Sequence, residues 1–360
     1  MAKFKRYYMV GNAHLDPVWL WRWQEGSAEA KATIRSALDR MKEFPEYKFV
    51  CSSASVYQWV EEFAPEMFEE VKERVAEGRF VVVGGWHVQP DCNLPSGEAF
   101  ARQSLYSQRY FKEKLGVTAK VGYNVDSFGH HVMLPQILKK SGMDSYIWMR
   151  PGHHEKDIEQ DVFEWVSPDG SSVLASHIIG AYTGWFETPE DMEQRHEVIE
   201  KENRSVSDAA AFFYGVGNHG GGPTVRNLEL MRGFAAAHPD IEVVYSDLSD
   251  FFDYVRGSGV EIPKYYEDLQ HHAPGCYSTV TRIKRGIRRS ECDLIAAESY
   301  QMLGSALLRR PASGERFRDA WRDVCFCHFH DSMDGCSIEE AYDDADLMLG
   351  HARRVAAVAQ

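Results

Sequence analysis

Short apolar runs rich in Val, Ile, Tyr and Phe recur along this chain between long amphipathic stretches, and this alternation constrains the fold more than any other feature. The runs expected to form strands are 7–10, 48–51, 80–83, 120–123, 145–149, 211–215 and 242–245. Helical patterns lie between most of them, for example at 28–43, 56–77 and 97–115. Strands that alternate with helices predict an α/β fold with a mostly parallel sheet and right-handed crossovers.

Two departures from this pattern divide the chain. At 162–179 two strand-like runs flank Ser-Pro-Asp-Gly (167–170), which has the composition of a hairpin turn and predicts an antiparallel pair. From Ile283 onward the pattern is helical almost to the last residue. We therefore predict an α/β domain over 1–268 and a helical domain over 269–360. Because the sequence ends in helix-favouring residues without a cap, we expect the helical domain to be truncated at its C-terminal end.

Composition limits the partners that the chain can have. With 54 acidic and 40 basic residues the formal net charge is −14, so a phosphate backbone is repelled and no nucleic acid is expected. No run of about 18 apolar residues occurs, so no membrane span is expected. The seven cysteines are scattered without a disulfide framework, and the N-terminus lacks a signal-peptide pattern. These features predict a cytoplasmic protein with reduced thiols.

His14 and Asp16 directly follow the first predicted strand, at the sheet edge where α/β enzymes place their sites. In an extended segment, residues i and i+2 point the same way, so the two side chains can offer one nitrogen and one oxygen to a single ion. That mixture suits zinc. A surface histidine followed by a turn aspartate is the structural alternative.

Asp126 follows a different predicted strand and precedes Phe128 and Gly129. A carboxylate at that edge can act as a nucleophile or as a metal ligand. A helix N-cap is an equally good interpretation of its position.

His330 lies far along the chain, in the helical region, after Cys325 and Cys327. On a helix, residues i and i+2 point to different faces, so the two cysteines are not expected to share an ion. We expect them to be buried as small apolar side chains. His330 itself also fits a hydrogen-bonded core histidine.

The segment 214–224 is rich in glycine, and Gly215, Gly217 and Gly220 form a G-x-G-x-x-G pattern after a predicted strand. This pattern can hold a dinucleotide pyrophosphate, which would indicate an NAD-dependent oxidoreductase. Its late position and the three glycines before Pro223 favour an open loop instead. Near the His-x-Asp segment, alternating tryptophans at 19, 21 and 23 suit either the C–H faces of a sugar or core packing.

Taken together, these segments resemble glycoside hydrolase family 38, the retaining α-mannosidases. The matching segments follow one another in the family's order along nearly the whole chain. They are His14-Leu15-Asp16 with Trp19, Gly84-Gly85-Trp86 through Asp91, Asp126-Ser127-Phe128-Gly129-His130, the glycine loop 215–224, the stretch 274–285 and Phe329-His330-Asp331.

The resemblance implies a distorted (β/α)7 barrel followed by a three-helix bundle, and an enzyme that cleaves α-linked mannose from oligosaccharides. It implies one divalent metal ion, with zinc favoured by the ligand types. The implied ligands are His14, Asp16, Asp126 and His330, and Asp126 doubles as the nucleophile. The implied substrate-binding residues are Trp19, Phe128, Arg150, Asp331 and, from the glycine loop, His219. Family members are commonly dimers or tetramers, so a homo-oligomer is expected.

The chain departs from the family in two respects. Many members carry a general acid/base aspartate in the glycine loop, where this chain has Asn218 and His219. Asparagine cannot give up a proton, whereas His219 can, and Asp91 is another candidate, so the acid/base stays unassigned. Family members also continue into β-rich domains that close the active site. Without them we expect weak activity or none.

Three other functions compete with this interpretation. A metal-dependent deacetylase or amidohydrolase on a similar barrel would use the metal to activate water. The glycine pattern keeps an NAD-dependent oxidoreductase open. The missing loop aspartate keeps open a carbohydrate-binding protein without catalysis.

Overall fold

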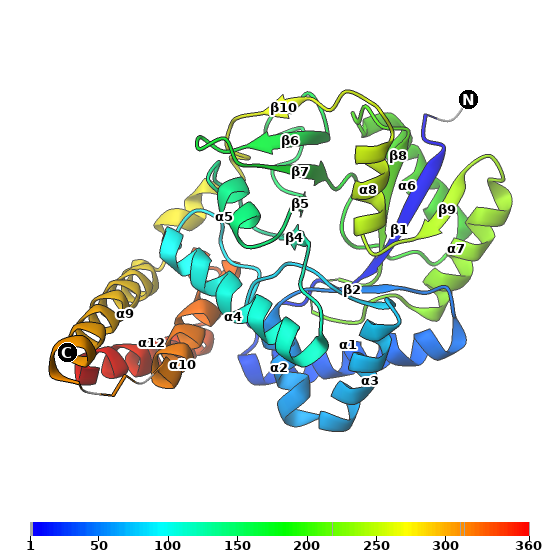
Figure 1. The fold of residues 1–360 in the computed structure, drawn as a ribbon. Coiled ribbons are helices and arrows are strands. Elements are labelled where there is room, and N and C mark those ends of the chain that lie inside the picture. The colour runs from blue at the N-terminus through cyan, green and yellow to red at the C-terminus, as the bar shows by residue number, and fades with distance from the viewer. Residues whose placement is uncertain (1–2, 218, 310, 313, 360) are drawn as a thin grey trace.

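The computed structural model describes residues 3–217, 219–309, 311–312 and 314–359 (Figure 1). Its strands form two five-stranded sheets. The first sheet has the order β3-β2-β1-β8. The last two residues of β1 pair with β2, and its first four residues pair with β9. It contains β1 (Arg6–Asn12), β2 (Phe49–Cys51), β3 (Phe80–Val82), β8 (Ala209–Tyr214) and β9 (Glu242–Tyr245).

The second sheet has the order β10-β6-β7-β5-β4. It contains β4 (Val121–Tyr123), β5 (Ser145–Trp148), β6 (Val162–Val166), β7 (Ser172–His177) and β10 (Lys264–Tyr265). Every pair in the two sheets is parallel except β6 with β7. The predicted hairpin is therefore confirmed, and its turn closes where the Ser167 amide donates to the Ser171 carbonyl at 2.9 Å.

The edges of the two sheets meet near the site described below. The amide of Gly84, two residues after β3, donates to the carbonyl of Val121 in β4 at 2.8 Å. Because both strands are parallel to their neighbours, the segments that follow β1, β3 and β4 emerge on the same side. The protein thus has the predicted α/β fold with mostly parallel strands.

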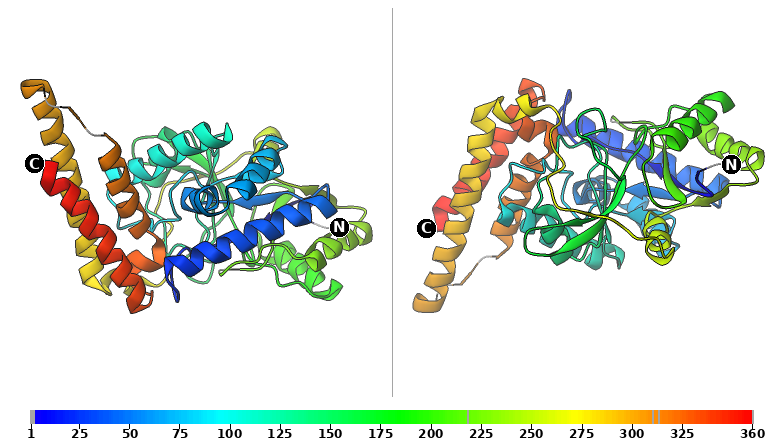
Figure 2. Two further views of the ribbon diagram at one scale, coloured as in Figure 1. Left: turned by 90° about the horizontal axis from the view of Figure 1, so that it is seen from below. Right: turned by 90° about the horizontal axis from the view of Figure 1, so that it is seen from above.

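Helices pack against the sheets on several sides, whereas β10 and β6 lie at the periphery (Figures 1 and 2). They are α1 (Trp23–Glu43), α2 (Ala54–Phe63), α3 (Pro65–Ala76), α4 (Gly97–Leu115), α5 (Leu134–Lys140), α6 (Pro189–Glu202), α7 (Val225–Ala237) and α8 (Ser249–Gly257). The helix predicted at 97–115 is confirmed, with Ser96 capping its first turn and Gly116 ending it in a left-handed conformation. The helical pattern at 56–77 forms two helices. Pro65 disfavours helical geometry at the preceding Ala64, which divides the segment into α2 and α3.

The C-terminal quarter of the chain is helical, as expected. After a 3₁₀ turn at Pro274–Ser278 come α9 (Thr281–Leu308), α10 (Gly314–Cys327), the short α11 (His330–Asp334) and α12 (Glu339–Ala359). The long helices share one apolar core, which includes Ile287, Leu294, Trp321 and Leu349. Figure 2 shows α9, α10 and α12 together at one side of the α/β part. Cys325 and Cys327 are buried, as predicted for apolar packing.

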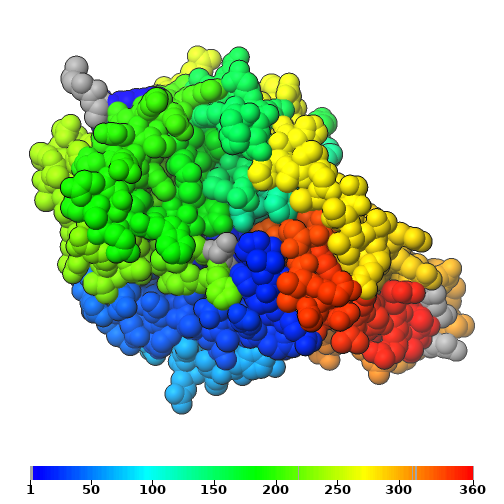
Figure 3. Space-filling model, turned by 180° about the vertical axis from the view of Figure 1, so that it is seen from behind, coloured from blue at the N-terminus to red at the C-terminus, as the bar shows by residue number. Residues whose placement is uncertain are grey.

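Backbone hydrogen bonds attach this helical part to the loops after β1 and β3. The Asp91 amide donates to the His328 carbonyl at 2.9 Å, and the Ile338 amide donates to the Trp19 carbonyl at 2.9 Å. In Figure 3 the N-terminal segment (blue) lies directly against the helical segment that carries α11 (orange). These contacts bring the start of α11 to the same edge of the sheets as the loops of the α/β part. No helix in the described part of the chain is both long and apolar enough to cross a bilayer.

Candidate metal centre

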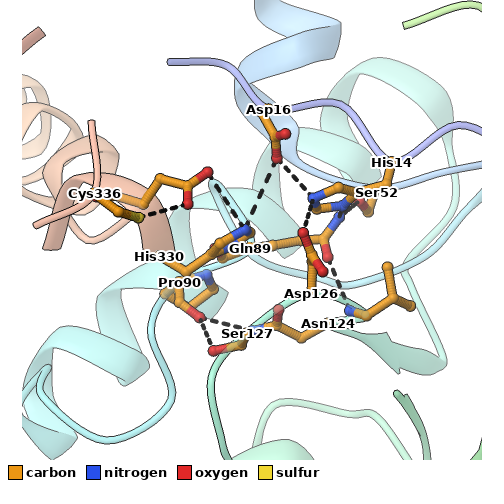
Figure 4. A network of polar contacts seen from close by, with 12 residues as sticks. His14, Asp16, Ser52, Gln89, Pro90, Asn124, Asp126, Ser127, His330 and Cys336 are labelled. Carbon is orange, nitrogen blue, oxygen red and sulfur yellow. Dashed lines mark hydrogen bonds and ion pairs between the residues drawn. The ribbon is translucent and has the colours of Figure 1, made fainter. Parts of the chain in front are cut away.

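Four predicted ligands from three distant segments meet at this edge (Figure 4). His14 and Asp16 lie in the stretch that follows β1, Asp126 follows β4, and His330 begins α11. One donor atom from each residue lies within 4.8 Å of the donor atoms of the other three. The structure thus brings the two histidines and two aspartates together.

The geometry of these atoms suits a cation between them. His14 Nε2 is 2.7 Å from Asp16 Oδ1 and 3.7 Å from Asp126 Oδ2, and His330 Nε2 is 3.8 Å from Asp16 Oδ1. His330 Nε2 is buried and has no hydrogen-bond partner among the described residues, and the buried atoms His14 Nε2 and Asp16 Oδ1 form an ion pair with each other but no aligned hydrogen bond. Buried polar atoms without partners are costly, and a bound cation would satisfy them. Two imidazole nitrogens and two carboxylate oxygens form a donor set that zinc accepts.

Burial and charge act differently on the two histidines. Burial lowers the pKa of His330 to about 4, with a further lowering by His14, so this ring is neutral near pH 7. Burial also acts to lower the pKa of His14, but the carboxylates of Asp16 and Asp126 outweigh it and raise the pKa above the ordinary value. A proton and a metal ion therefore compete for His14 more than for His330.

Three of the predicted substrate-binding residues contact the ligands. The Arg150 guanidinium forms an ion pair with Asp126 Oδ1. The Phe128 ring lies 6.0 Å from the His330 ring in an edge-on arrangement. Asp331 Oδ2 is 3.9 Å from His330 Nε2, and burial together with the nearby Asp16 carboxylate raises the Asp331 pKa to about 8.

The other two predicted substrate-binding residues, Trp19 and His219, both contact Trp21. The ring of Trp21 is 5.6 Å from that of Trp19 and 3.9 Å from that of His219. Trp21 in turn donates its indole N–H to the Asp16 carbonyl at 3.1 Å. His219 Nε2 is 3.5 Å from Glu25 Oε1. Asn218, the other acid/base position of this loop, lies outside the described residues.

Asp91 is closed off from solvent and pairs with another carboxyl group. It is fully buried, and its Oδ1 accepts the amides of Asn93 and Leu94 at 2.9 and 2.6 Å. Burial raises the pKa of Asp91, and burial with the neighbouring Asp91 raises the pKa of Asp334 well above its ordinary value. This placement gives Asp91 a structural environment rather than access to a substrate.

The glycine loop turns back on itself. The Val216 amide donates to the Gly222 carbonyl at 2.9 Å, and α7 begins only at Val225, capped by Thr224. A phosphate-binding loop runs from its strand directly into a helix N-terminus. The expectation of an open loop, rather than a helix start, therefore matches the structure.

Two residues at the site could not be identified from sequence patterns. Gln89, buried in the loop after β3, contacts both ligand histidines. Tyr182 places its ring 5.1 Å from that of His14, and burial together with the Asp126 and Asp16 carboxylates raises its pKa. Both lie in irregular segments, where no periodicity indicates which side chains point inward.

A second histidine–carboxylate cluster lies behind Arg150. Asp161 Oδ1 is 2.7 Å from both His153 Nε2 and His177 Nδ1. His177 Nε2 is 2.8 Å from the Met149 carbonyl oxygen, which can only accept a hydrogen bond. The two ring nitrogens of His177 therefore face two acceptors, Asp161 Oδ1 and this carbonyl oxygen. The cluster thereby holds the backbone that leads into Arg150.

Comparison with known proteins shows the family of this chain. Residues 5–268 match the model of the glycosyl hydrolases family 38 N-terminal domain, and residues 271–357 match that of the alpha mannosidase middle domain. The chain belongs to glycosyl hydrolase family 38.

Several of the similar curated proteins are alpha-mannosidases. The chain is 32% identical over 352 residues to alpha-mannosidase G of Dictyostelium discoideum, covering 94% of this chain and 31% of that protein. It is 28% identical over 345 residues to human alpha-mannosidase 2C1, covering 94% and 33%. The chain thus spans about a third of the length of these curated relatives. An alpha-mannosidase structure from Enterococcus faecalis V583 superposes with a TM-score of 0.88 at 18% identity, over 99% of this chain and 42% of that one, which shows the shared fold.

Proposed function

We propose that this chain is the catalytic part of a metal-dependent α-mannosidase, a retaining glycoside hydrolase that removes α-linked mannose from oligosaccharides. The observation that carries the proposal is the convergence of His14, Asp16, Asp126 and His330, whose donor atoms lie within 4.8 Å of one another. Membership of family 38 supports the reaction class. These four residues would hold one divalent ion, with zinc favoured by the donor set.

The residues of the site have separate tasks in this proposal. Bound zinc would supply a Lewis acid that grips sugar hydroxyls next to the reacting carbon. Asp126 is the nucleophile, and the Arg150 guanidinium forms an ion pair with its carboxylate. The same pair fixes the direction of the carboxylate, which lowers the entropic cost of the attack.

The surrounding residues would bind the sugar. Phe128 and Trp19 offer apolar faces to the C–H groups of the ring, and Asp331 offers carboxyl oxygens to its hydroxyls. Phe128 is half-buried between His330, which lies edge-on to it, and His272, whose ring stacks on it with centroids 5.8 Å apart. His219 would lie toward the outer side of the pocket, where it contacts Trp21.

The whole chain would be organised as two domains. Residues 1–268 would form a distorted (β/α)7 barrel made of the two sheets, and 269–360 a three-helix bundle built on the core of α9, α10 and α12. The seven cysteines are all unpaired in the described part of the chain, in keeping with a cytoplasmic location.

Hydrolysis of an aryl α-mannoside by the zinc-loaded chain, followed by NMR, tests this function. We expect α-mannose to form first, because a retaining mechanism preserves the anomeric configuration. Asp126→Asn should lower the rate by about 10³-fold or more, because it removes the nucleophile. Release of β-mannose first, or of acetate from acetylated sugars in place of mannose, would contradict the proposal and, in the second case, favour a deacetylase.

A further inference from the structure

A pocket of about 350 Å³ lies between the α/β part and the helical part of the chain. Its walls come from the start of α1, from α2, from the loop after β3 and from α10 and α12. None of the described residues that line it is a predicted metal ligand or a predicted substrate-binding residue. Its volume is at the lower end of the range for small-molecule sites, so it has room for one sugar unit.

Three half-buried aromatic side chains line this pocket, those of Trp23, Trp59 and Phe326. The Trp23 and Trp59 rings are nearly parallel, with an interplanar angle of 26° and centroids 6.4 Å apart. The Phe326 ring lies edge-on to that of Trp59, with centroids 5.8 Å apart. Because each ring keeps part of its surface exposed, the pocket offers flat apolar surface, which suits the C–H face of a pyranose ring.

Two buried polar side chains also line the pocket. Ser55 is 3% exposed and His87 is 5% exposed, and neither Ser55 Oγ nor His87 Nδ1 has a hydrogen-bond partner among the described residues. Burial lowers the pKa of His87 to about 3, so its ring is neutral near pH 7. Buried polar atoms without partners are costly, so two of them beside one cavity indicate a polar occupant.

The charged side chains at the pocket favour an uncharged ligand with many hydroxyl groups. Three carboxylates and one guanidinium line it, which disfavours an anion. In the described part of the chain, Glu62 makes no hydrogen bond or ion pair, and the Arg322 guanidinium donates to the Gln58 side-chain oxygen but pairs with no carboxylate. A carboxylate only accepts and a guanidinium only donates, whereas a hydroxyl does both and can serve either group.

We propose that this pocket is a second carbohydrate site, which binds one hexose unit against Trp23 and Trp59. The rings contact the C–H face of the sugar, and the polar side chains contact its hydroxyls. The inference goes beyond the proposed function and does not depend on a metal ion at the candidate metal centre. A quaternary ammonium ion would also suit tryptophans beside carboxylates, but it offers no hydrogen bond to Arg322 or to the buried polar atoms.

An NMR titration of the purified chain with D-mannose tests the proposal, because mannose is released and not consumed in the proposed reaction. The indole N–H signal of Trp59, identified by its absence in Trp59→Leu, reports on this pocket alone. We expect mannose to shift this signal with a dissociation constant of about 1–10 mM, as for other ligands of its size. The same shift is expected after metal has been removed with a chelator.

Two variants with matched controls locate the binding. Trp23→Leu removes the second ring and should weaken mannose binding about 5–10-fold, whereas Tyr300→Leu, at an exposed aromatic position of α9, should not change it. Glu62→Gln removes a charged acceptor at the rim and should weaken binding about 3–10-fold. Glu66→Gln, at an exposed position of α3 that does not line the pocket, is its control.

The outcomes separate this inference from the proposed function. Absence of a Trp59 shift at about 100 mM mannose, roughly ten times the weakest expected dissociation constant, would overturn the second site and leave the metal centre untouched. Unchanged affinity in Trp23→Leu would overturn it too, and if that variant does not fold, unchanged affinity in Glu62→Gln decides. Tighter binding of tetramethylammonium than of mannose would overturn the ligand class.

Discussion

The two histidines at the candidate metal centre differ in how firmly they hold a proton. Burial lowers the pKa of His330 to about 4, whereas the Asp16 and Asp126 carboxylates raise that of His14 against the effect of its burial. Since a protonated imidazole cannot bind metal, a fall in pH should displace zinc mainly at His14. We expect zinc occupancy at fixed free zinc to decline between about pH 7 and 5, measured by equilibrium dialysis. Full occupancy at pH 4 would contradict this.

A second residue-scale prediction concerns the buried pair of carboxyl groups, Asp91 and Asp334. Burial and Asp91 raise the pKa of Asp334 in the folded protein, so the folded state binds more protons than the unfolded chain. An aspartate in the unfolded chain has a pKa of about 4, and below this pH Asp334 makes its full contribution to the free energy of unfolding. As pH rises above it, that contribution falls by up to about 1.4 kcal/mol per pH unit. Asp334→Asn should remove this decline and raise the free energy of unfolding near pH 7 by about 1–3 kcal/mol.

Urea unfolding at pH 5 and pH 8 measures this effect. The difference in unfolding free energy between the two pH values should shrink in Asp334→Asn. Asp240→Asn, at an exposed position, should leave it unchanged. An equal or larger difference in Asp334→Asn would show that the pair is not destabilised at neutral pH.

At the scale of elements, the ends of β1 and β8 approach so closely that only glycine fits at Gly215. Its φ is +124°, and a Cβ there would lie 2.1 Å from the carbonyl oxygen of Asn12, two residues before His14. We expect Gly215→Ala to lower the free energy of unfolding by about 2–4 kcal/mol, measured by urea unfolding.

Gly233→Ala is the control, because Gly233 lies inside α7 with nothing within 4 Å of a Cβ. It should stabilise by about 0.5–1 kcal/mol. Similar effects of the two substitutions would contradict the close approach.

Elements with local signals could be predicted, and those fixed by distant contacts could not. The boundaries of α4 follow from its Ser96 cap and from Gly116, both visible in the sequence. Pro65 is also visible in the sequence, but the apolar periodicity continues across it, so the helical pattern at 56–77 was not divided there. The short α11, which begins at His330, shows no apolar periodicity that would predict it. Its position depends instead on contacts with the loop after β3.

At the scale of the whole molecule, the candidate metal centre joins the α/β part to the helical part. Bound zinc should therefore stabilise the fold against unfolding, by about 2.7 kcal/mol when free zinc is 100 times its dissociation constant. Thermal unfolding with and without zinc measures this gain. His330→Ala should abolish it. An equal gain in His330→Ala would place the bound zinc elsewhere.

Contacts between residues far apart in the sequence are the part of the site that the sequence could not predict. Gln89 is 75 residues from His14 and 241 from His330, and no spacing rule brings such segments together. The ligand set was predicted only because the motifs occur in the order of a known family. The contacts of Gln89 and Tyr182 follow from the packing of loops, which depends on the complete fold.

Metal content of the purified chain tests the central claim most directly. We predict about one zinc per chain in wild type by elemental analysis, lost in both His14→Ala and His330→Ala, because the two residues hold the same ion. Loss in both variants would tie two segments far apart in the sequence to one site. Wild-type protein without metal after purification free of chelators, or one zinc retained in either variant, would contradict the account.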